Sequence, residues 1–197
     1  YLSPIPEHCG TGLQIYAEFH LEGLNLVGDL PPVLAGLEAM RMTARGIDAD
    51  GMRNAGHLFR VNSMATLGIS ERKLVRRIAT ALCDLAKQET YARQTLLEEN
   101  PRIFEDAAAR ALAILKSARL LAPLELFDLL SPILLAANMK RLSGISSRDV
   151  RSLMIAQIEK PLLPPPETIA DERRRDNRDA ALADRVNRHF ANVGLEF

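Results

Sequence analysis

The chain has 197 residues, and its 25 Lys and Arg balance 25 Asp and Glu, so its formal net charge is zero. Nucleic-acid-binding proteins usually carry an excess of positive charge, so this balance argues against a nucleic-acid partner. Hydrophobic residues make up 47% of the chain, but charges or prolines interrupt each apolar run before the roughly 18 residues that a membrane span needs. The composition predicts a soluble globular protein of one domain with an appendage.

The cysteines and the first residues indicate the compartment. Cys9 and Cys83 form neither a disulfide framework nor a metal-binding spacing. The start, Tyr1-Leu2-Ser3-Pro4, has no basic-then-apolar export signal and no initiator Met. We therefore expect a cytoplasmic protein without a bound metal, and a further segment upstream of residue 1.

The first third of the chain predicts strands. Apolar residues alternate over 13–21, which is typical of a strand with one buried face. A Gly- and Pro-containing turn over 28–32 leads into a short amphipathic helix over 33–40, and two more strands follow over 41–47 and 57–64. Three strands need helices or further strands to cover a buried face, so other elements must complete the sheet.

Beyond residue 70 every predicted element is a helix. Apolar residues recur every three to four positions over 70–99, 100–118, 124–139 and from 146 or 147 to about 159. Pro132 lies inside the third of these helices and is expected to kink it.

The last part of the chain combines a proline-rich segment with a charged one. The run Leu162-Leu163-Pro164-Pro165-Pro166 predicts a stiff linker. Charges of both signs follow at helical spacing, and Leu182, Val186 and Phe190 form a thin apolar stripe. The pattern favours a solvated helix.

One candidate for chemistry is the Gly-rich segment over 7–12. Such a turn can bring backbone N–H groups close to a phosphate, but this one lacks the rest of a phosphate-binding loop, so an ordinary tight turn is the favoured interpretation. His8 beside Cys9 suggests a base and a nucleophile. Neighbouring side chains on an extended chain point to opposite sides, which argues against that pair.

Two further candidates combine arginine with aspartate. Arg45 at a strand end, with Asp50 in the following loop, can clamp a phosphate and position a nucleophile; a surface ion pair is the alternative, and the sequence by itself favours it. Arg148, Asp149 and Arg151 open the helix at about 147, where they either bind an anion or form an ordinary solvated first turn, and the second interpretation is favoured.

Three segments in order carry a resemblance to a known family. The opening YLSPIPEHCGTGL (1–13) resembles Y-L-T-S-C-P-T-N-x-G-T-G-L, and RGIDADG (45–51) resembles R-G-x-x-G-E-G. GHLFRVNSMATLG (56–68) resembles G-x-x-F-Q-I-S-N-Q-x-T-L-G. Taken together they resemble the C-terminal half of bacterial protein arginine kinases, which belong to the phosphagen (guanidino) kinase superfamily.

The resemblance implies an α+β fold. It would consist of the C-terminal part of the antiparallel guanidino-kinase sheet with flanking helices, followed by a helical module. The implied divisions are the C-terminal part of the catalytic domain over 1–98, the helical module over 99–160, and a Pro-rich linker with a charged helical or disordered tail over 161–197.

The resemblance also implies where the site lies and how it differs from the family. Arg45 falls on a phosphate-clamping arginine, and Asp50 falls on the glutamate that orients the substrate guanidinium. Ile5 replaces a cysteine beside the guanidinium, His8 replaces an asparagine, and Gln14 replaces a second phosphate-clamping arginine. The spacings agree with the family, so these differences are substitutions and not a misalignment.

In this family MgATP phosphorylates arginine side chains of proteins, marking them for a Clp-type protease. The resemblance therefore implies ATP with Mg as cofactor. It also implies the upstream kinase half, a second copy bound through the helical module, or another protein as partners. The substitutions predict a protein-arginine kinase of reduced activity, with a non-catalytic pseudokinase or interaction module as the alternative.

A second family motif, the phosphoarginine receptor R-D-x-x-R-A, resembles the segment that starts at Arg148-Asp149. Here Ser152 stands at the second arginine of the motif, and Arg151 lies one place early. A phosphoarginine-receptor region at these residues is therefore a weaker expectation than the first site.

Overall fold

The computed structural model describes residues 13–46, 54–63, 69–158 and 169–197. The described residues fall into two compact units, one up to Glu99 and one from Asn100 to Phe197. The first combines a small antiparallel sheet with helices, and the second is mainly helical. The predicted α+β class is confirmed.

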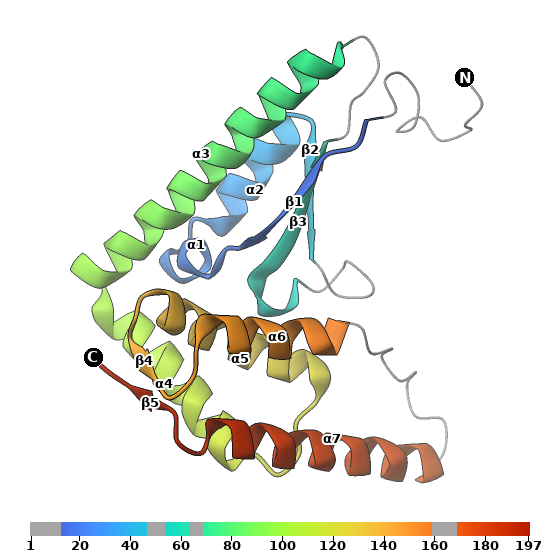
Figure 1. Cartoon of the computed structure of the whole chain (residues 1–197), viewed down its shortest axis with the longest axis vertical. Helices are drawn as coiled ribbons and strands as arrows, with labels where there is room; N and C mark the ends of the chain where they lie inside the picture. Colours follow the sequence, from blue (N-terminus) through green and yellow to red (C-terminus); the bar gives the residue numbers. More distant parts are fainter. Residues whose placement is uncertain (1–12, 47–53, 64–68, 159–168) are drawn as a thin grey trace. The chain divides into compact units, whose positions relative to one another are not determined.

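The sheet of the first unit has three strands, β1 (Tyr16–His20), β2 (Met42–Gly46) and β3 (Leu58–Ser63). β3 lies in the centre and pairs antiparallel with both neighbours, in the order β1-β3-β2 (Figure 1). The three strands predicted from the sequence are present. The short 3-10 turn η2 (Ala55–His57) leads into β3.

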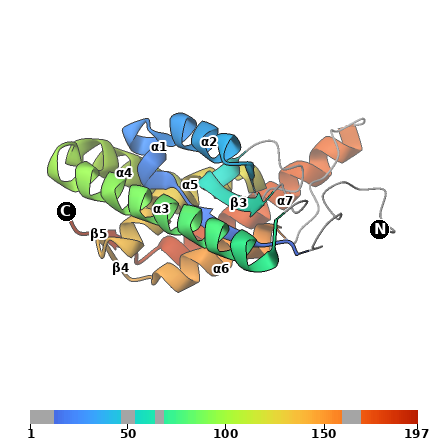
Figure 2. The same ribbon diagram turned by 90° about the horizontal axis from the view of Figure 1, so that it is seen from above.

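Three helices bury one face of this sheet: α1 (Glu22–Val27), α2 (Leu30–Ala39) and α3 (Glu71–Glu98). α1 packs on α3, and α2 packs on β2 (Figures 1 and 2). Phe59 and Val61 of β3 share a core with Leu74 and Ile78, which are one turn apart on α3. The apolar residues that alternate along the strands therefore pack against the apolar residues that recur along α3, and together they form one core layer.

α1 was not predicted, and a residue far along the chain explains why it forms. The carboxylate of Glu89 on α3 accepts hydrogen bonds from the backbone N–H groups of Gly23 and Leu24, each at 3.0 Å. Arg93 Nε donates to the same carboxylate at 2.7 Å, and Glu89 is only 5% exposed. A helix of six residues is too short to be stable by itself, so a partner on α3 stabilises its first turn.

The second unit is built from α4 (Pro101–Ser117), α5 (Pro123–Asn138), α6 (Ser147–Ile158) and α7 (Ile169–Phe190). α5 packs against α4 and α6, and α4 packs against α7. Pro132 lies inside α5, as predicted. None of the helices in the described ranges is both long and apolar enough to cross a membrane.

The predicted charged segment forms the helix α7, and its apolar stripe packs on the unit, with Leu182 at 6% and Phe190 at 0% exposure. One feature of the second unit differs from the sequence prediction. The expectation that only helices follow residue 70 is wrong, because β4 (Leu142–Ser143) pairs with β5 (Gly194–Leu195). Strands of two residues carry no readable alternation, and their partners lie about fifty residues apart, so the sequence pattern does not reveal them.

Replacing Glu89 by Gln should lower the free energy of unfolding by about 2 kcal/mol, because the amide cannot serve both backbone donors and the Arg93 guanidinium. Glu98→Gln is the matched control, since it removes the same charge from an exposed position of α3; it should change the free energy by less than about 0.5 kcal/mol. Urea unfolding followed by circular dichroism measures both. Equal effects of the two substitutions would contradict the role given to Glu89.

Candidate functional site

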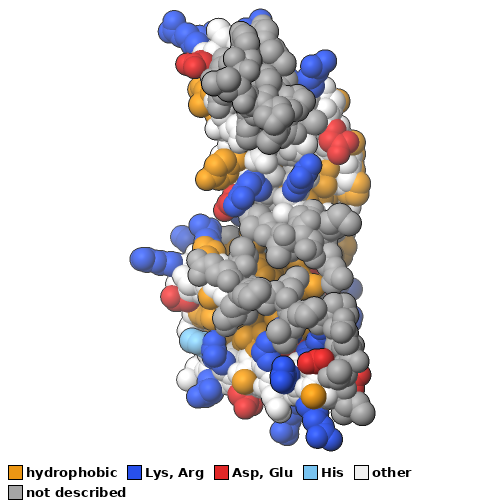
Figure 3. All heavy atoms as spheres, turned by 90° about the vertical axis from the view of Figure 1, so that its right-hand side faces the viewer, with side chains coloured by type: hydrophobic (Ala, Val, Ile, Leu, Met, Phe, Trp, Pro, Cys, Tyr) orange, Lys and Arg blue, Asp and Glu red, His pale blue; other side chains and the backbone are white. Residues whose placement is uncertain are grey.

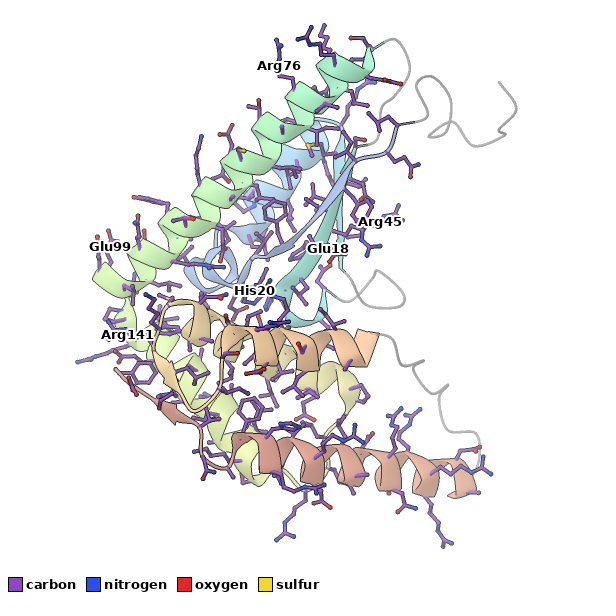
Figure 4. All side chains as sticks on the ribbon, in the orientation of Figure 1. Glu18, His20, Arg45, Arg76, Glu99 and Arg141 are labelled. Carbon is purple, nitrogen blue, oxygen red and sulfur yellow. The ribbon has the colours of Figure 1, made fainter. Side chains whose placement is uncertain are left out.

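The exposed face of the sheet carries polar and charged side chains. Because side chains alternate along a strand, the residues next to the buried ones point away from α1, α2 and α3. Figure 4 shows Arg45 projecting from the sheet on the side away from α2 and α3, and Figure 3 shows that side of the molecule, where Lys and Arg side chains lie beside acidic ones. The residues of this face include Tyr16, Glu18, Thr43, Arg45, Arg60 and Asn62.

One row of this face crosses all three strands. In the register of the sheet, Arg60 on the central strand lies opposite Arg45 on one side and opposite Glu18 on the other. Nη2 and Nε of Arg60 donate to Oε1 of Glu18 at 2.6 and 3.1 Å. The Arg60 guanidinium also lies 5.2 Å from the centre of the Tyr16 ring, which is a cation–π distance. Two neighbours on β1 therefore fix the orientation of the Arg60 side chain.

A hollow of about 310 Å³ opens on this face. It brings Gln14, which lies two residues before the start of β1, together with Arg45 of β2, although the two residues are far apart in sequence. The lining is completed by Ile15, Tyr16, Thr43, Arg60, Asn62 and Ser63. Two predicted positions of the phosphate clamp thus share one concave surface, and one of them holds a neutral amide.

Three further positions of this site were predicted from the motifs. Ile5, His8 and Asp50 lie outside the described residues. The roles assigned to these three positions, and to Gln14 and Arg45, stay predictions.

The donors around the hollow suit an anion with several oxygens. Guanidinium groups bind phosphate oxygens through paired, charge-assisted hydrogen bonds, and the Thr43 and Ser63 hydroxyls and the Asn62 amide add neutral donors. Within the ranges that the structure describes, no group of three or more His, Cys, Asp or Glu is placed to hold a metal ion. The lining therefore fits an oxyanion such as phosphate better than a bare cation.

Arg60 was missed by the sequence analysis. Its segment was quoted for the resemblance, and Arg60 falls on the glutamine of the motif G-x-x-F-Q-I-S-N-Q-x-T-L-G. The sequence did contain one signal for Arg60, because a positive charge stands there at a position where the motif has a neutral residue. Only the register of β3 shows that this cation faces Arg45.

The predicted receptor residues Arg148, Asp149 and Arg151 lie in the first turns of α6, in the second unit, and all three are exposed. The Ser146 hydroxyl donates to Oδ2 of Asp149 at 2.6 Å, and the Asp149 N–H donates back to the Ser146 oxygen at 3.3 Å. This reciprocal pair is a helix cap. It lowers the pKa of Asp149, first through the Ser146 hydroxyl and then through the Ser146 backbone N–H.

A hollow of about 400 Å³ lies beside this cap and is lined by Gly144, Ile145, Asp149, Ser152, Leu153 and His189. Arg148 and Arg151 are not among its described lining residues. The geometry assigns Asp149 to the helix cap, and binding of phosphoarginine here stays a prediction.

Comparison with known proteins supports the similarity expected from the motifs. Residues 1–92 match the family profile described as ATP:guanido phosphotransferase, C-terminal catalytic domain. A protein-arginine kinase of Moorella thermoacetica is 34% identical over 155 residues, which are 79% of this chain and 44% of the relative. The protein-arginine kinase of Pelotomaculum thermopropionicum is 32% identical over 193 residues, 98% of this chain and 53% of the relative.

A third protein-arginine kinase, from Halalkalibacterium halodurans, is 31% identical over 182 residues, 92% of this chain and 51% of the relative. The chain spans about half the length of the curated relatives it matches. The similarity continues into the second unit, because the matches reach beyond the 92 residues of the family profile.

Asp149 should make the stability of the protein depend on pH in the acid range. A lowered folded-state pKa means that the stabilisation is complete above the ordinary carboxyl value of about 4 and is lost as the pH falls through the folded value. Asp149→Asn should therefore lower the melting temperature near neutral pH, and this difference from the unsubstituted protein should vanish under strongly acidic conditions.

Melting curves recorded by circular dichroism across the acid range measure this difference. Asp106→Asn on α4 is the control, because it removes an exposed carboxylate that lies 3.7 Å from Arg110, and such pairs stabilise little. A difference for Asp149→Asn that stays constant or grows on acidification would contradict the assignment of Asp149 to the cap.

Proposed function

We propose that this chain, which belongs to the ATP:guanido phosphotransferase family, is the C-terminal part of a protein-arginine kinase whose catalytic activity is reduced. The observation that carries the proposal is the hollow on the exposed sheet face, which holds Gln14 beside Arg45. In this proposal the hollow is the scaffold of a phosphate site, and one of its two motif positions, Gln14, carries no positive charge.

The loss of charge matters because phosphoryl transfer depends mainly on positioning and on neutralising the phosphate oxygens. ATP with Mg would supply the transferable phosphoryl group, and Arg45, together with Thr43 and Ser63 of the same lining, would hold its phosphates. Gln14 can donate a hydrogen bond to a phosphate but cannot neutralise its charge. Removing one such cation costs a factor on the order of hundreds to thousands in rate.

Two further substitutions act in the same direction. Aspartate at position 50 places its carboxylate about one methylene short of the family's glutamate, and Ile5 cannot ionise or donate a hydrogen bond. Their effects do not add to that of Gln14 in a simple way, because residues of one site act as a unit.

The compartment and the partners are part of the same proposal. Cys83 is an exposed free thiol, which suits the reducing cytoplasm. As the chain spans about half of its relatives, we propose that an upstream kinase half completes the site. A second copy bound through the helices of the second unit is the other proposed partner.

A non-catalytic module that binds a protein through its helices is the second candidate. The feature that favours it is a hollow of about 700 Å³ beside α2 and α3, lined largely by apolar groups and including Met40 and Tyr91. Met40 is 43% and Tyr91 69% exposed. Exposed apolar side chains around a groove are typical of protein-binding surfaces.

Labelled MgATP and an arginine-rich acceptor protein, incubated with the complete protein that includes the proposed upstream half, test the two candidates. We expect slow formation of acid-labile phosphoarginine, abolished by Asp50→Ala. Gln14→Arg should raise the rate about tenfold or more, because it returns a positive charge to the phosphate site. Asp106→Asn, which removes a carboxylate from the second unit, is the control and should leave the rate unchanged.

Absence of phosphoryl transfer in both the unsubstituted protein and Gln14→Arg would contradict the kinase proposal and favour the non-catalytic module. Transfer that persists in Asp50→Ala would contradict the role given to Asp50.

A further inference from the structure

We propose that Arg60 supplies a second positive charge to the phosphate site, which compensates only in part for the one absent at Gln14 because Glu18 offsets it. The inference rests on the proposed function, since it assigns a residue to the same hollow. It concerns a residue that stands where the family motif has a glutamine.

The position of Arg60 is fixed by the sheet. Arg60 and Arg45 lie opposite each other on adjacent antiparallel strands, where Cβ atoms are about 5 Å apart. Both side chains line the hollow that also contains Gln14. A polyphosphate held by Arg45 is therefore within reach of the Arg60 guanidinium.

The pairing of two arginines needs a reason, because like charges directly opposite each other destabilise a sheet. Glu18, on the other side of Arg60, offsets one of the two charges, so the row Glu18–Arg60–Arg45 keeps a net charge of one positive unit. An anion bound between the two guanidinium groups removes the remaining repulsion. Arrangements that destabilise the free protein, such as two arginines opposite each other, are expected at binding sites.

Arg60 is also held in place before a ligand arrives. Glu18 accepts from Nε and Nη2, and the Tyr16 ring lies against the guanidinium. The other N–H groups of the guanidinium take no part in these two hydrogen bonds, so they can donate to phosphate oxygens. Glu18 thus positions Arg60 but also competes with the anion for its charge.

This competition gives a test that separates charge from structure. Arg60→Gln and Glu18→Gln both remove the same ion pair, and a purely structural role would give both variants the same effect on binding. If Arg60 binds phosphate, the two substitutions change the affinity in opposite directions. Arg110→Gln in the second unit is the control, because it removes an exposed arginine that is 3.7 Å from an aspartate, Asp106.

The experiment is isothermal titration of the full chain with MgATP and, separately, with inorganic tripolyphosphate. We expect Arg60→Gln to raise the Kd about tenfold, Glu18→Gln to lower it several-fold, and Arg110→Gln to leave it unchanged. Equal dependence on Arg60 for both ligands supports recognition of the polyphosphate chain itself. Dependence seen with MgATP alone supports recognition of phosphates carried by a nucleotide.

Melting curves without ligand verify that each variant is folded. Arg45→Gln separates the two proposals: if it abolishes binding while Arg60→Gln binds as tightly as the unsubstituted protein, the phosphate site stands and the assignment of Arg60 is overturned. Loss of affinity in both Arg60→Gln and Glu18→Gln would also overturn it, because the ion pair would then matter only for structure. If neither ligand binds the unsubstituted chain, with or without the proposed upstream half, the proposed function fails as well.

Discussion

The register that β3 holds with β1 and β2 decides which side chains of the first unit meet. Side chains alternate along each strand, so this register places Phe59 and Val61 against the helices and Arg60 and Asn62 on the exposed face. If β2 slipped by one residue along β3, Arg45 would turn toward the core and Ala44 toward solvent. The core and the candidate site are therefore specified by the same hydrogen-bond ladder, and neither can be rearranged without the other.

Charged side chains are paired differently on the two sides of the sheet. Behind the buried face, Glu89 is enclosed and fully engaged, because two backbone N–H groups and Arg93 donate to its carboxylate. A Cβ added at Gly23 would lie 2.8 Å from this carboxylate, so the first turn of α1 can approach it only at a residue without a side chain. On the exposed face, by contrast, Arg45 and Arg60 lie opposite each other, and among the described residues of this face Glu18 is the carboxylate paired with Arg60. The first arrangement stabilises the fold, and the second costs stability and is suited to an incoming anion.

The sequence predicted those parts of the fold that depend on local patterns. The alternation over 13–21 indicated β1, and the recurrence of apolar residues from Leu74 onward indicated α3. The helix α1 was missed because its stabilising group, Glu89, lies more than sixty residues along the chain. The β4–β5 pair was missed for a similar reason, since two short segments from distant parts of the chain supply it.

In the candidate site, too, the sequence predicted the residues that belong to local motifs and missed the one that depends on strand pairing. The motifs indicated Gln14 and Arg45, and the structure brings both to one hollow. Arg60 has no local pattern that separates it from any polar residue on a strand, and its relation to Arg45 exists only in the paired sheet. The Asp149 carboxylate forms a cap with Ser146, which agrees with the first-turn interpretation that the sequence favoured, while a phosphoarginine-receptor role of this region stays a prediction.

The central claim, that the exposed sheet face is the phosphate site, is tested most directly by titrating the ¹⁵N-labelled chain with MgATP and recording backbone amide shifts. The account predicts that the largest shifts cluster over residues 14–18, 43–46 and 60–63. Large shifts confined to the first turns of α6, or to the apolar hollow beside α2 and α3, would contradict it.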